Sequence, residues 1–318
     1  MSTTTSDNPH DRYFKEAFSQ PHILTDFLNV YLPDALREQL DFSSIVREPD
    51  SYTDEALSEH FADLVFTARL GGQAVRIALL LEHKSYVEPH IHFQLNRYML
   101  NAWQQQLAEK KPLLPMIPVV IYHGRRKWIK HTMISYFGNV PSVASPFVPN
   151  FDYVLVDLTT ILDRLPAFAT DYARLTGVLL QNSRQRRSLE RALLTIADNI
   201  NRLLADARGE QFFQTSLIYL SWVTKLTRAQ LVVIFRDVSQ QAENYNMSLY
   251  EQLIQEGVQK GIEQGIVQGV EQGVDQTAIK AVRAMLKLNM DAAAIAAALE
   301  LPLERVEGYI GQLNAAAQ

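Results

Sequence analysis

The chain has 318 residues, a formal net charge of −5 at pH 7 and no cysteine. The missing cysteines exclude disulfides and any site that needs a thiolate, and the acidic balance excludes a polycation that coats nucleic acid. With 47% hydrophobic and 20% charged residues, the composition is typical of a globular protein with a sizeable core. There is neither an apolar secretory signal at the N-terminus nor a run of roughly 20 apolar residues, so we expect a cytoplasmic protein without a membrane span.

Two helices are predicted near the N-terminus. Apolar residues recur at helical spacing between Phe14 and Leu32. The Gln20-Pro21 step predicts a turn between the two helices, and Pro33 ends the pattern.

The middle of the chain predicts a mixed sheet. Residues 61–70 and 75–85 are strand-like, and Gly71-Gly72 between them predicts a hairpin turn. A hairpin followed by a long helix and more strands predicts an α/β fold with a mixed sheet flanked by helices. The long helix is expected over 88–111, further strands over 115–124 and 151–159, and mainly helices over 172–238.

A glycine repeat sets the C-terminal region apart. Glycine stands at 257, 261, 265, 269 and 273, with aliphatic residues at the same step. Each glycine costs a helix about 1 kcal/mol relative to alanine, but small residues four apart let two helices approach closely. The repeat therefore predicts a helix that associates with copies of itself, and a flexible linker is the alternative.

The last residues predict a small helical unit, with breaks at Asn289-Met290 and Leu301-Pro302. Either a simple helical bundle or a helix-turn-helix that reads DNA fits this pattern. The expected organisation is a domain over 1–240, the glycine-periodic segment over 241–277 and the small helical domain over 278–318.

Two basic segments stand out against the acidic whole. They are HGRRKWIKH, from His123 to His131, and NSRQRRSLER, from Asn182 to Arg191. Lysine and arginine neutralise phosphates and release counterions, so either segment suits contact with nucleic acid. A solvated surface is the alternative for each.

The strongest chemical signal lies at the end of the second predicted strand. Because side chains alternate along a strand, Glu82 and Lys84 point to the same side, and Asp63 in the neighbouring strand could lie near Glu82. Two carboxylates suit a hard cation such as Mg²⁺, Mn²⁺ or Ca²⁺, which activates water and stabilises charge in phosphodiester hydrolysis. A structural salt bridge is the alternative for these three residues.

Other polar residues are candidate additions to this site. Gln94, Arg97 and Tyr98 have the spacing of one helical face and could contact a nucleic acid. The N-terminal helix offers Asp11 or Glu16 as a third acidic group. By contrast, His83, His90 and His92 are poorly spaced for zinc.

These blocks, in this order, resemble the Rpn family of recombination-promoting nucleases, also known as YhgA-like putative transposases, in the PD-(D/E)XK superfamily. The resemblance covers about residues 9 to 210 and implies a restriction-endonuclease-like mixed sheet. It assigns Asp63 and Glu82 as metal ligands and Lys84 as the catalytic lysine, with Gln94 and Tyr98 as the trailing helix motif. Ala62 replaces the proline that names the superfamily.

The resemblance implies a metal-dependent DNA endonuclease that promotes recombination and takes part in phage defence. Tails like the glycine-periodic one occur in this family, and Met247 is a candidate start for a short C-terminal inhibitor. The alternatives are a catalytically silent DNA-binding or protein-binding module and a helical oligomerisation protein whose α/β domain is a scaffold.

Overall fold

The computed structural model describes residues 8–48, 61–82, 88–224 and 226–315. The chain divides into two compact units, Met1–Met247 and Ser248–Gln318. Within the described residues, no helix is both long enough and apolar enough to cross a lipid bilayer.

A five-stranded sheet forms the centre of the first unit, with the strands in the order β1-β2-β3-β4-β5. The pairs β1–β2 and β2–β3 are antiparallel, whereas β3–β4 and β4–β5 are parallel. This confirms the predicted mixed sheet. The strands are β1 (Leu40–Arg47), β2 (Phe61–Leu70), β3 (Gln73–Glu82), β4 (Met116–Tyr122) and β5 (Val154–Asp157).

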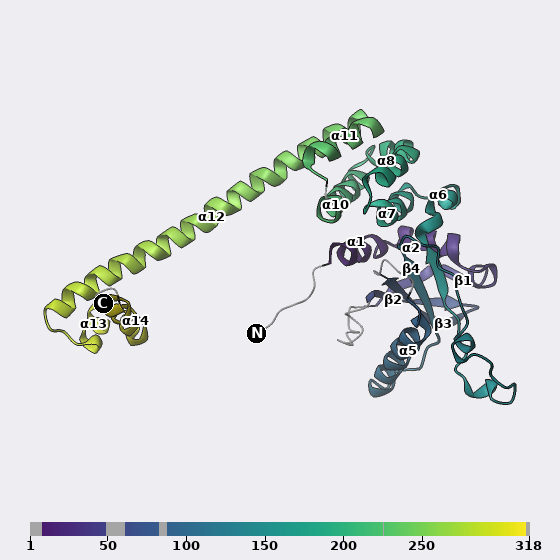
Figure 1. The fold of residues 1–318 in the computed structure, drawn as a ribbon, viewed down its shortest axis with the longest axis horizontal. Helices are drawn as coiled ribbons and strands as arrows, with labels where there is room; N and C mark the ends of the chain where they lie inside the picture. Colours follow the sequence, from purple (N-terminus) through teal and green to yellow (C-terminus); the bar gives the residue numbers. More distant parts are fainter. Residues whose placement is uncertain (1–7, 49–60, 83–87, 225, 316–318) are drawn as a thin grey trace. The chain divides into compact units, whose positions relative to one another are not determined.

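Helices cover both faces of this sheet (Figure 1). Helix α5 (Ile91–Ala108) lies on one face, and α1 (Pro9–Phe18) and α2 (Pro21–Tyr31) lie on the other. The predicted break at Gln20-Pro21 is confirmed, because α2 begins with Pro21 in its first turn.

Further helices pack on the side of α1 and α2. Helix α7 (Asp171–Asn182) contacts α2, and α10 (Ala207–Val223) contacts α1. The Tyr13 and Tyr219 rings stack between α1 and α10 with centroids 4.2 Å apart. Within the described part of this unit, further helices are α3 (Asp34–Arg37), α6 (Ile161–Arg164), α8 (Arg186–Thr195), α9 (Ala197–Leu203) and α11 (Arg228–Val238).

The hairpin between β2 and β3 has the predicted turn. Gly71 and Gly72 both have positive φ angles, 55° and 80°, which suit glycine in a two-residue turn. The hairpin pairs Leu70 with Gln73 and continues in register to the pair of Phe61 and Glu82.

Short 3₁₀ segments interrupt the chain between β4 and α7. They are η1 (Met133–Phe137), η2 (Ser145–Phe147), η3 (Leu158–Thr160) and η4 (Leu165–Ala167).

The second unit is helical. Helix α12 (Gln240–Lys287) contains the whole glycine-periodic segment and continues into this unit. It is followed by α13 (Ala292–Leu299) and α14 (Leu303–Ala315). A core that includes Val282, Ile295 and Val306 joins the end of α12 to both.

The surface of α14 favours the simple bundle over a helix that reads DNA. Its charged residues are Glu304, Arg305 and Glu307, and Arg305 is held by Asp275 at 2.7 Å. A recognition helix needs cations for phosphates and bases, and α14 offers only this paired one.

Candidate active site

The register of the β2–β3 hairpin places Asp63 beside Glu82. Asp63 pairs with Leu80, and Phe61 pairs with Glu82. Paired residues of an antiparallel ladder share a face, and so do residues two apart along a strand. Asp63 and Glu82 are therefore diagonal neighbours on one face, a relation that corresponds to a separation of about 7 Å. Their side chains lie outside the part that the structure describes.

This face is the one that α5 covers. Val65 pairs with Ala78 on the same face. Val65 is two residues along β2 from Asp63, and Ala78 is four residues along β3 from Glu82. Val65 and Ala78 are both buried in one cluster with Leu95 of α5. The two acidic positions thus lie where the apolar core under α5 gives way to the end of the sheet.

Gln94 brings an unsatisfied polar atom to the same region. It lies one residue before Leu95 on α5, and its Oε1 atom is buried without a hydrogen-bond partner among the described residues. A buried amide oxygen that lacks a donor is costly, and such an oxygen is a good ligand for a hard cation or for an ordered water.

The structure separates the other two residues of this helix face. Arg97 is exposed, whereas Tyr98 is 6% exposed and belongs to the core under α5. Tyr98 therefore supports the turn that carries Gln94, and its ring is not presented to a ligand here. The predicted catalytic Lys84 lies outside the described residues.

A second set of polar residues meets at the neighbouring strand end. Glu82 is in register with Tyr122, the last residue of β4. The next residue, His123, is 1% exposed and lies against His10 of α1, with ring centroids 5.0 Å apart. His10 Nδ1 in turn lies 2.7 Å from the Tyr219 hydroxyl.

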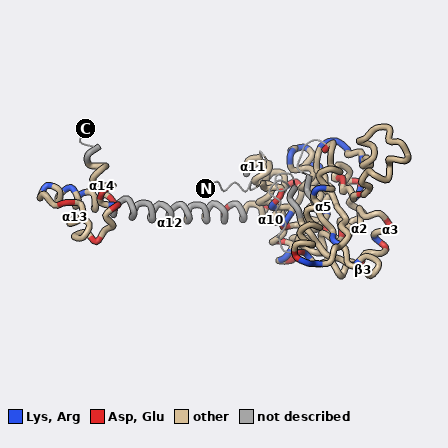
Figure 2. Tube along the Cα trace, turned by 90° about the horizontal axis from the view of Figure 1, so that it is seen from below, with Lys and Arg blue, Asp and Glu red and all other residues tan. Residues whose placement is uncertain are grey.

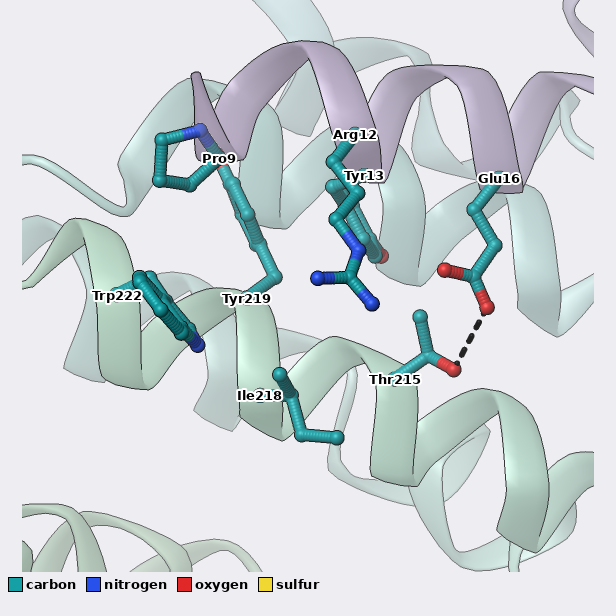
Figure 3. A pocket seen from close by; sticks show the side chains of 8 residues that line it. All are labelled: Pro9, Arg12, Tyr13, Glu16, Thr215, Ile218, Tyr219 and Trp222. Carbon is teal, nitrogen blue, oxygen red and sulfur yellow. Dashed lines mark hydrogen bonds between the residues drawn. The ribbon is translucent and has the colours of Figure 1, made fainter. Parts of the chain in front are cut away.

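The structure distinguishes the two candidates for a third acidic group. Glu16 accepts a hydrogen bond from Thr215 at 3.0 Å, and it lines a cavity of about 140 Å³ between α1 and α10 (Figure 3). Asp11 instead follows His10, which contacts His123 at the strand end, and its Oδ1 atom is buried. Asp11 is therefore the candidate on the side of the predicted site.

The chain segment after β4 is held firmly in place. Trp128 N–H donates to Asp157 at 3.0 Å, and Gln181 donates to the Gly124 carbonyl at 3.1 Å. The Trp128 ring packs edge-on against Tyr122, with centroids 4.9 Å apart. This segment contains the first of the two basic runs.

Of the histidines that the sequence spaces poorly for zinc, His90 and His92 both lie against the aromatic ring of Tyr136. His92 is buried beside Tyr136, and its Nδ1 lies 3.2 Å from the Tyr136 hydroxyl. Burial lowers the pKa of His92, which favours the neutral ring. His83 lies outside the described residues. Among the side chains that are described, no three acidic or histidine residues group as a metal site.

Sequence reasoning missed His123, Arg184 and Asp157 as neighbours of the site. His123 and Asp157 stand at strand ends, which is a usable signal. The contact of Arg184 with His123 joins residues 61 positions apart, and one sequence carries no signal for it.

The chain is similar to several known proteins. It is 30% identical to the recombination-promoting nuclease RpnD of Escherichia coli O157:H7 over 51% of this chain and 64% of that protein. It is 24% identical to the inactive recombination-promoting nuclease-like protein RpnE of E. coli K12, over 81% of this chain and 85% of that protein. It is 33% identical to the recombination-promoting nuclease RpnA of the same strain, over 39% of this chain and 43% of that protein.

The chain thus spans less than two thirds of RpnD and RpnA but most of RpnE. No solved structure matches it. Residues 8–210 match the family described as "Putative transposase, YhgA-like". They include both acidic positions, α5 and the two basic segments, and the chain belongs to this family.

Proposed function

We propose that this protein is a metal-dependent DNA endonuclease. The observation that carries the proposal is the register that sets Asp63 and Glu82 side by side on the face covered by α5. Two acidic positions at a sheet end, together with a buried Gln94 oxygen on the covering helix that has no donor among the described residues, are oxygen donors of the kind that Mg²⁺, Mn²⁺ and Ca²⁺ prefer.

The residues present fit such a cation, and each has a role in the proposal. Asp63 and Glu82 would hold the metal, Gln94 would add an oxygen from α5, and Asp11 would be the third acidic group. A bound cation would supply an activated water and offset charge on the phosphate. Lys84 would orient the attacking water or stabilise the developing charge.

The names of the relatives support the reaction class. RpnD and RpnA are named recombination-promoting nucleases. We therefore extend the proposal to cleavage that promotes DNA recombination. A part in phage defence is proposed from the family resemblance of the sequence alone. Arg97, exposed on α5 two turns from the helix start, would contact the DNA backbone.

A second candidate has its own support. RpnE, an inactive nuclease-like protein, is similar to 81% of this chain. The second candidate is accordingly a silent DNA-binding or protein-binding module on the same fold. It predicts DNA binding without turnover in the presence of any divalent metal.

The C-terminal part carries two further proposals. The glycine-periodic stretch of α12 would associate with a second copy, and a short product starting at Met247 would act as an inhibitor. The boundary between the two units falls directly after Met247, so such a product would comprise the whole second unit. A blot for a C-terminal tag tests this, and a single full-length band would refute the short product.

Cleavage of supercoiled plasmid by the purified protein tests the main proposal. Nicking should appear with Mg²⁺ or Mn²⁺ and disappear with excess EDTA. If folded protein binds the plasmid but leaves it intact with Mg²⁺, Mn²⁺ and Ca²⁺, the silent module replaces the nuclease.

A further inference from the structure

The two basic segments of the sequence meet in space at the end of the sheet. Arg184 Nη2 lies 3.5 Å from His123 Nε2, and Gln181 donates to the Gly124 carbonyl. Burial lowers the pKa of Arg184, and the nearby charge of Arg125 acts in the same direction. Two segments whose contacting residues are 61 positions apart therefore meet at the buried His123, with the half-buried Arg184 beside it.

The donor and acceptor atoms of the contact with His123 can be assigned. His123 Nδ1 lies 3.2 Å from the Leu180 carbonyl oxygen, which can only accept, so Nδ1 donates. In the neutral ring Nε2 is then an acceptor, facing the guanidinium of Arg184. The buried imidazole thus ties the strand end to the segment that carries Arg184 and holds that guanidinium in place.

The first segment presents its cations to solvent. Arg125, Arg126 and Lys127 are all exposed. None of the three forms an ion pair with a described carboxylate, in contrast to Lys130, which pairs with Asp152 at 2.6 Å. Exposed cations without carboxylate partners are available to neutralise phosphates.

The backbone under these cations is fixed before any ligand arrives. The segment begins one residue after Tyr122, and directly after the three cations the backbone N–H of Trp128 donates to Asp157. Trp128 itself is 4% exposed against Tyr122. Charged groups on a preorganised segment lose less conformational freedom on binding than groups on a mobile one.

The surface lies next to the proposed site. Tyr122 is the register partner of Glu82, and strands in a sheet are about 4.8 Å apart. Across the first unit as a whole, basic and acidic stretches are interspersed (Figure 2). The run of cations at the sheet end is therefore a local feature, because the unit as a whole is not basic.

We propose that Arg125, Arg126, Lys127 and Arg184 form a basic strip that binds the phosphate backbone of duplex DNA beside the sheet end. This inference rests on the proposed function for the identity of the ligand. In this proposal the strip contacts phosphates, which fix the position of a protein on the duplex and carry no sequence information directly.

The test compares two variants with the same change in charge. The strip variant is Arg125→Gln, Arg126→Gln and Lys127→Gln. The control variant is Arg69→Gln, Lys110→Gln and Lys111→Gln, three exposed cations near the opposite end of the sheet, where Arg69 pairs with Ala74 at the start of β3. Anisotropy of a labelled 20-base-pair duplex is measured over a series of salt concentrations in EDTA, so that metal-dependent cleavage does not contribute.

In the strip variant, the logarithm of the DNA association constant should fall less steeply with the logarithm of the salt concentration. The magnitude of this slope should decrease by about 2 to 3, close to 0.9 for each phosphate that is no longer neutralised. The strip variant should also bind at least about tenfold more weakly at 0.1 M salt, and the control variant should match the wild type. Equal slopes for all three proteins overturn the strip, and so does the absence of salt-dependent binding by the wild type.

The outcome is separable from the proposed function. DNA binding through the strip, without cleavage in any metal, would refute the nuclease and leave the strip standing. Metal-dependent cleavage, combined with a salt slope in the strip variant equal to that of the wild type, would refute the strip and leave the nuclease standing. Should the triple variant fail to fold, Lys127→Gln alone must reduce the slope by about 0.9.

Discussion

At the scale of single residues, the pair of Arg76 and Glu48 is the most deeply buried ion pair among the described residues. Arg76 is 1% exposed, and its Nε and Nη2 atoms donate to the two oxygens of Glu48, with Nε at 2.7 Å. Glu48 follows β1, and its N–H donates to the Val65 carbonyl at 2.8 Å. The pair thus connects the start of β3 to the chain beyond β1.

Breaking this pair should strongly destabilise the protein. Glu48→Ala removes both carboxylate oxygens that accept from the buried Arg76 guanidinium, and loss of one partner of a buried ion pair costs about 3–5 kcal/mol. The matched control is Glu190→Ala, which removes the half-buried partner of the exposed Arg186 at 2.7 Å and should cost less than about 1 kcal/mol. Urea unfolding followed by circular dichroism measures both, and similar losses for the two variants would contradict the account.

Asp171 should make the stability of the protein depend on acid pH. Burial alone would raise its pKa, but hydrogen bonds from Arg202 and Asn199 and the charge of Arg202 outweigh burial and hold the pKa below its usual value. Because the folded pKa is the lower one, the stabilisation is complete above the unfolded value of about 4 and is lost as pH falls through the folded pKa.

Melting temperatures between about pH 6 and pH 2 test this. Asp171→Asn should melt below the wild type at pH 6, and the two curves should converge toward pH 2. The exposed Asp163 offers the control Asp163→Asn, which should follow the wild type throughout. A constant difference between the wild type and Asp171→Asn at every pH would show that the carboxylate charge is not responsible.

At the scale of elements, the turn after β4 depends on a glycine. A Cβ atom added at Gly124 would overlap the hydroxyl oxygen of Tyr122. Tyr122 is fully buried, so its ring has little room to move away. The glycine therefore lets the basic segment turn over the tyrosine ring at the end of the sheet.

Gly124→Ala should cost about 1–3 kcal/mol through overpacking. Gly308→Ala is the matched control, because α14 leaves open space around that position, and the change should stabilise the helix by up to about 1 kcal/mol. The melting temperatures of both variants, compared with that of the wild type, test these two expectations. A neutral Gly124→Ala would mean that the Tyr122 ring can shift after all.

The predicted elements show where local sequence suffices. Gly71-Gly72 located the hairpin, because only a glycine pair adopts two positive φ angles readily. Strand β1 was not predicted. Its sequence LDFSSIVR alternates poorly, and its pairing with β2 shifts register between Asp41 and Val46, so tertiary pairing rather than pattern defines it.

The glycine repeat makes a prediction about association at the same scale. Helix α12 is continuous through residues 257–273, although each glycine disfavours a helix. If close contact between two copies offsets that cost, Gly261→Ala, Gly265→Ala and Gly269→Ala together should raise helicity yet shift the protein toward monomer. Gln264→Ala, Gln268→Ala and Gln272→Ala form the control and should keep the wild-type mass in light scattering. An unchanged mass in the glycine variant would contradict the proposed association.

At the scale of the whole molecule, one part of the candidate site could be predicted from the sequence, and another part depends on how distant segments pack. The spacing of Asp63 and Glu82 in two adjacent strands was sufficient to predict that they are neighbours, since the hairpin turn fixes the register. The meeting of the two basic segments was not predictable. It depends on α7 ending beside β4, a long-range packing that leaves no periodicity in the sequence.

If Asp63 and Glu82 hold the metal that cleaves DNA, as we propose, plasmid cleavage must depend on the Glu82 carboxylate. Plasmid cleavage in Mn²⁺ is compared for the wild type, Glu82→Gln and the control Glu38→Gln, an exposed glutamate near the hairpin end of the sheet, with DNA affinity measured in parallel. We expect Glu82→Gln to lose about 100-fold or more in cleavage rate with unchanged DNA affinity, and Glu38→Gln to match the wild type. Equal cleavage by the wild type and Glu82→Gln would place the chemistry elsewhere and contradict the account.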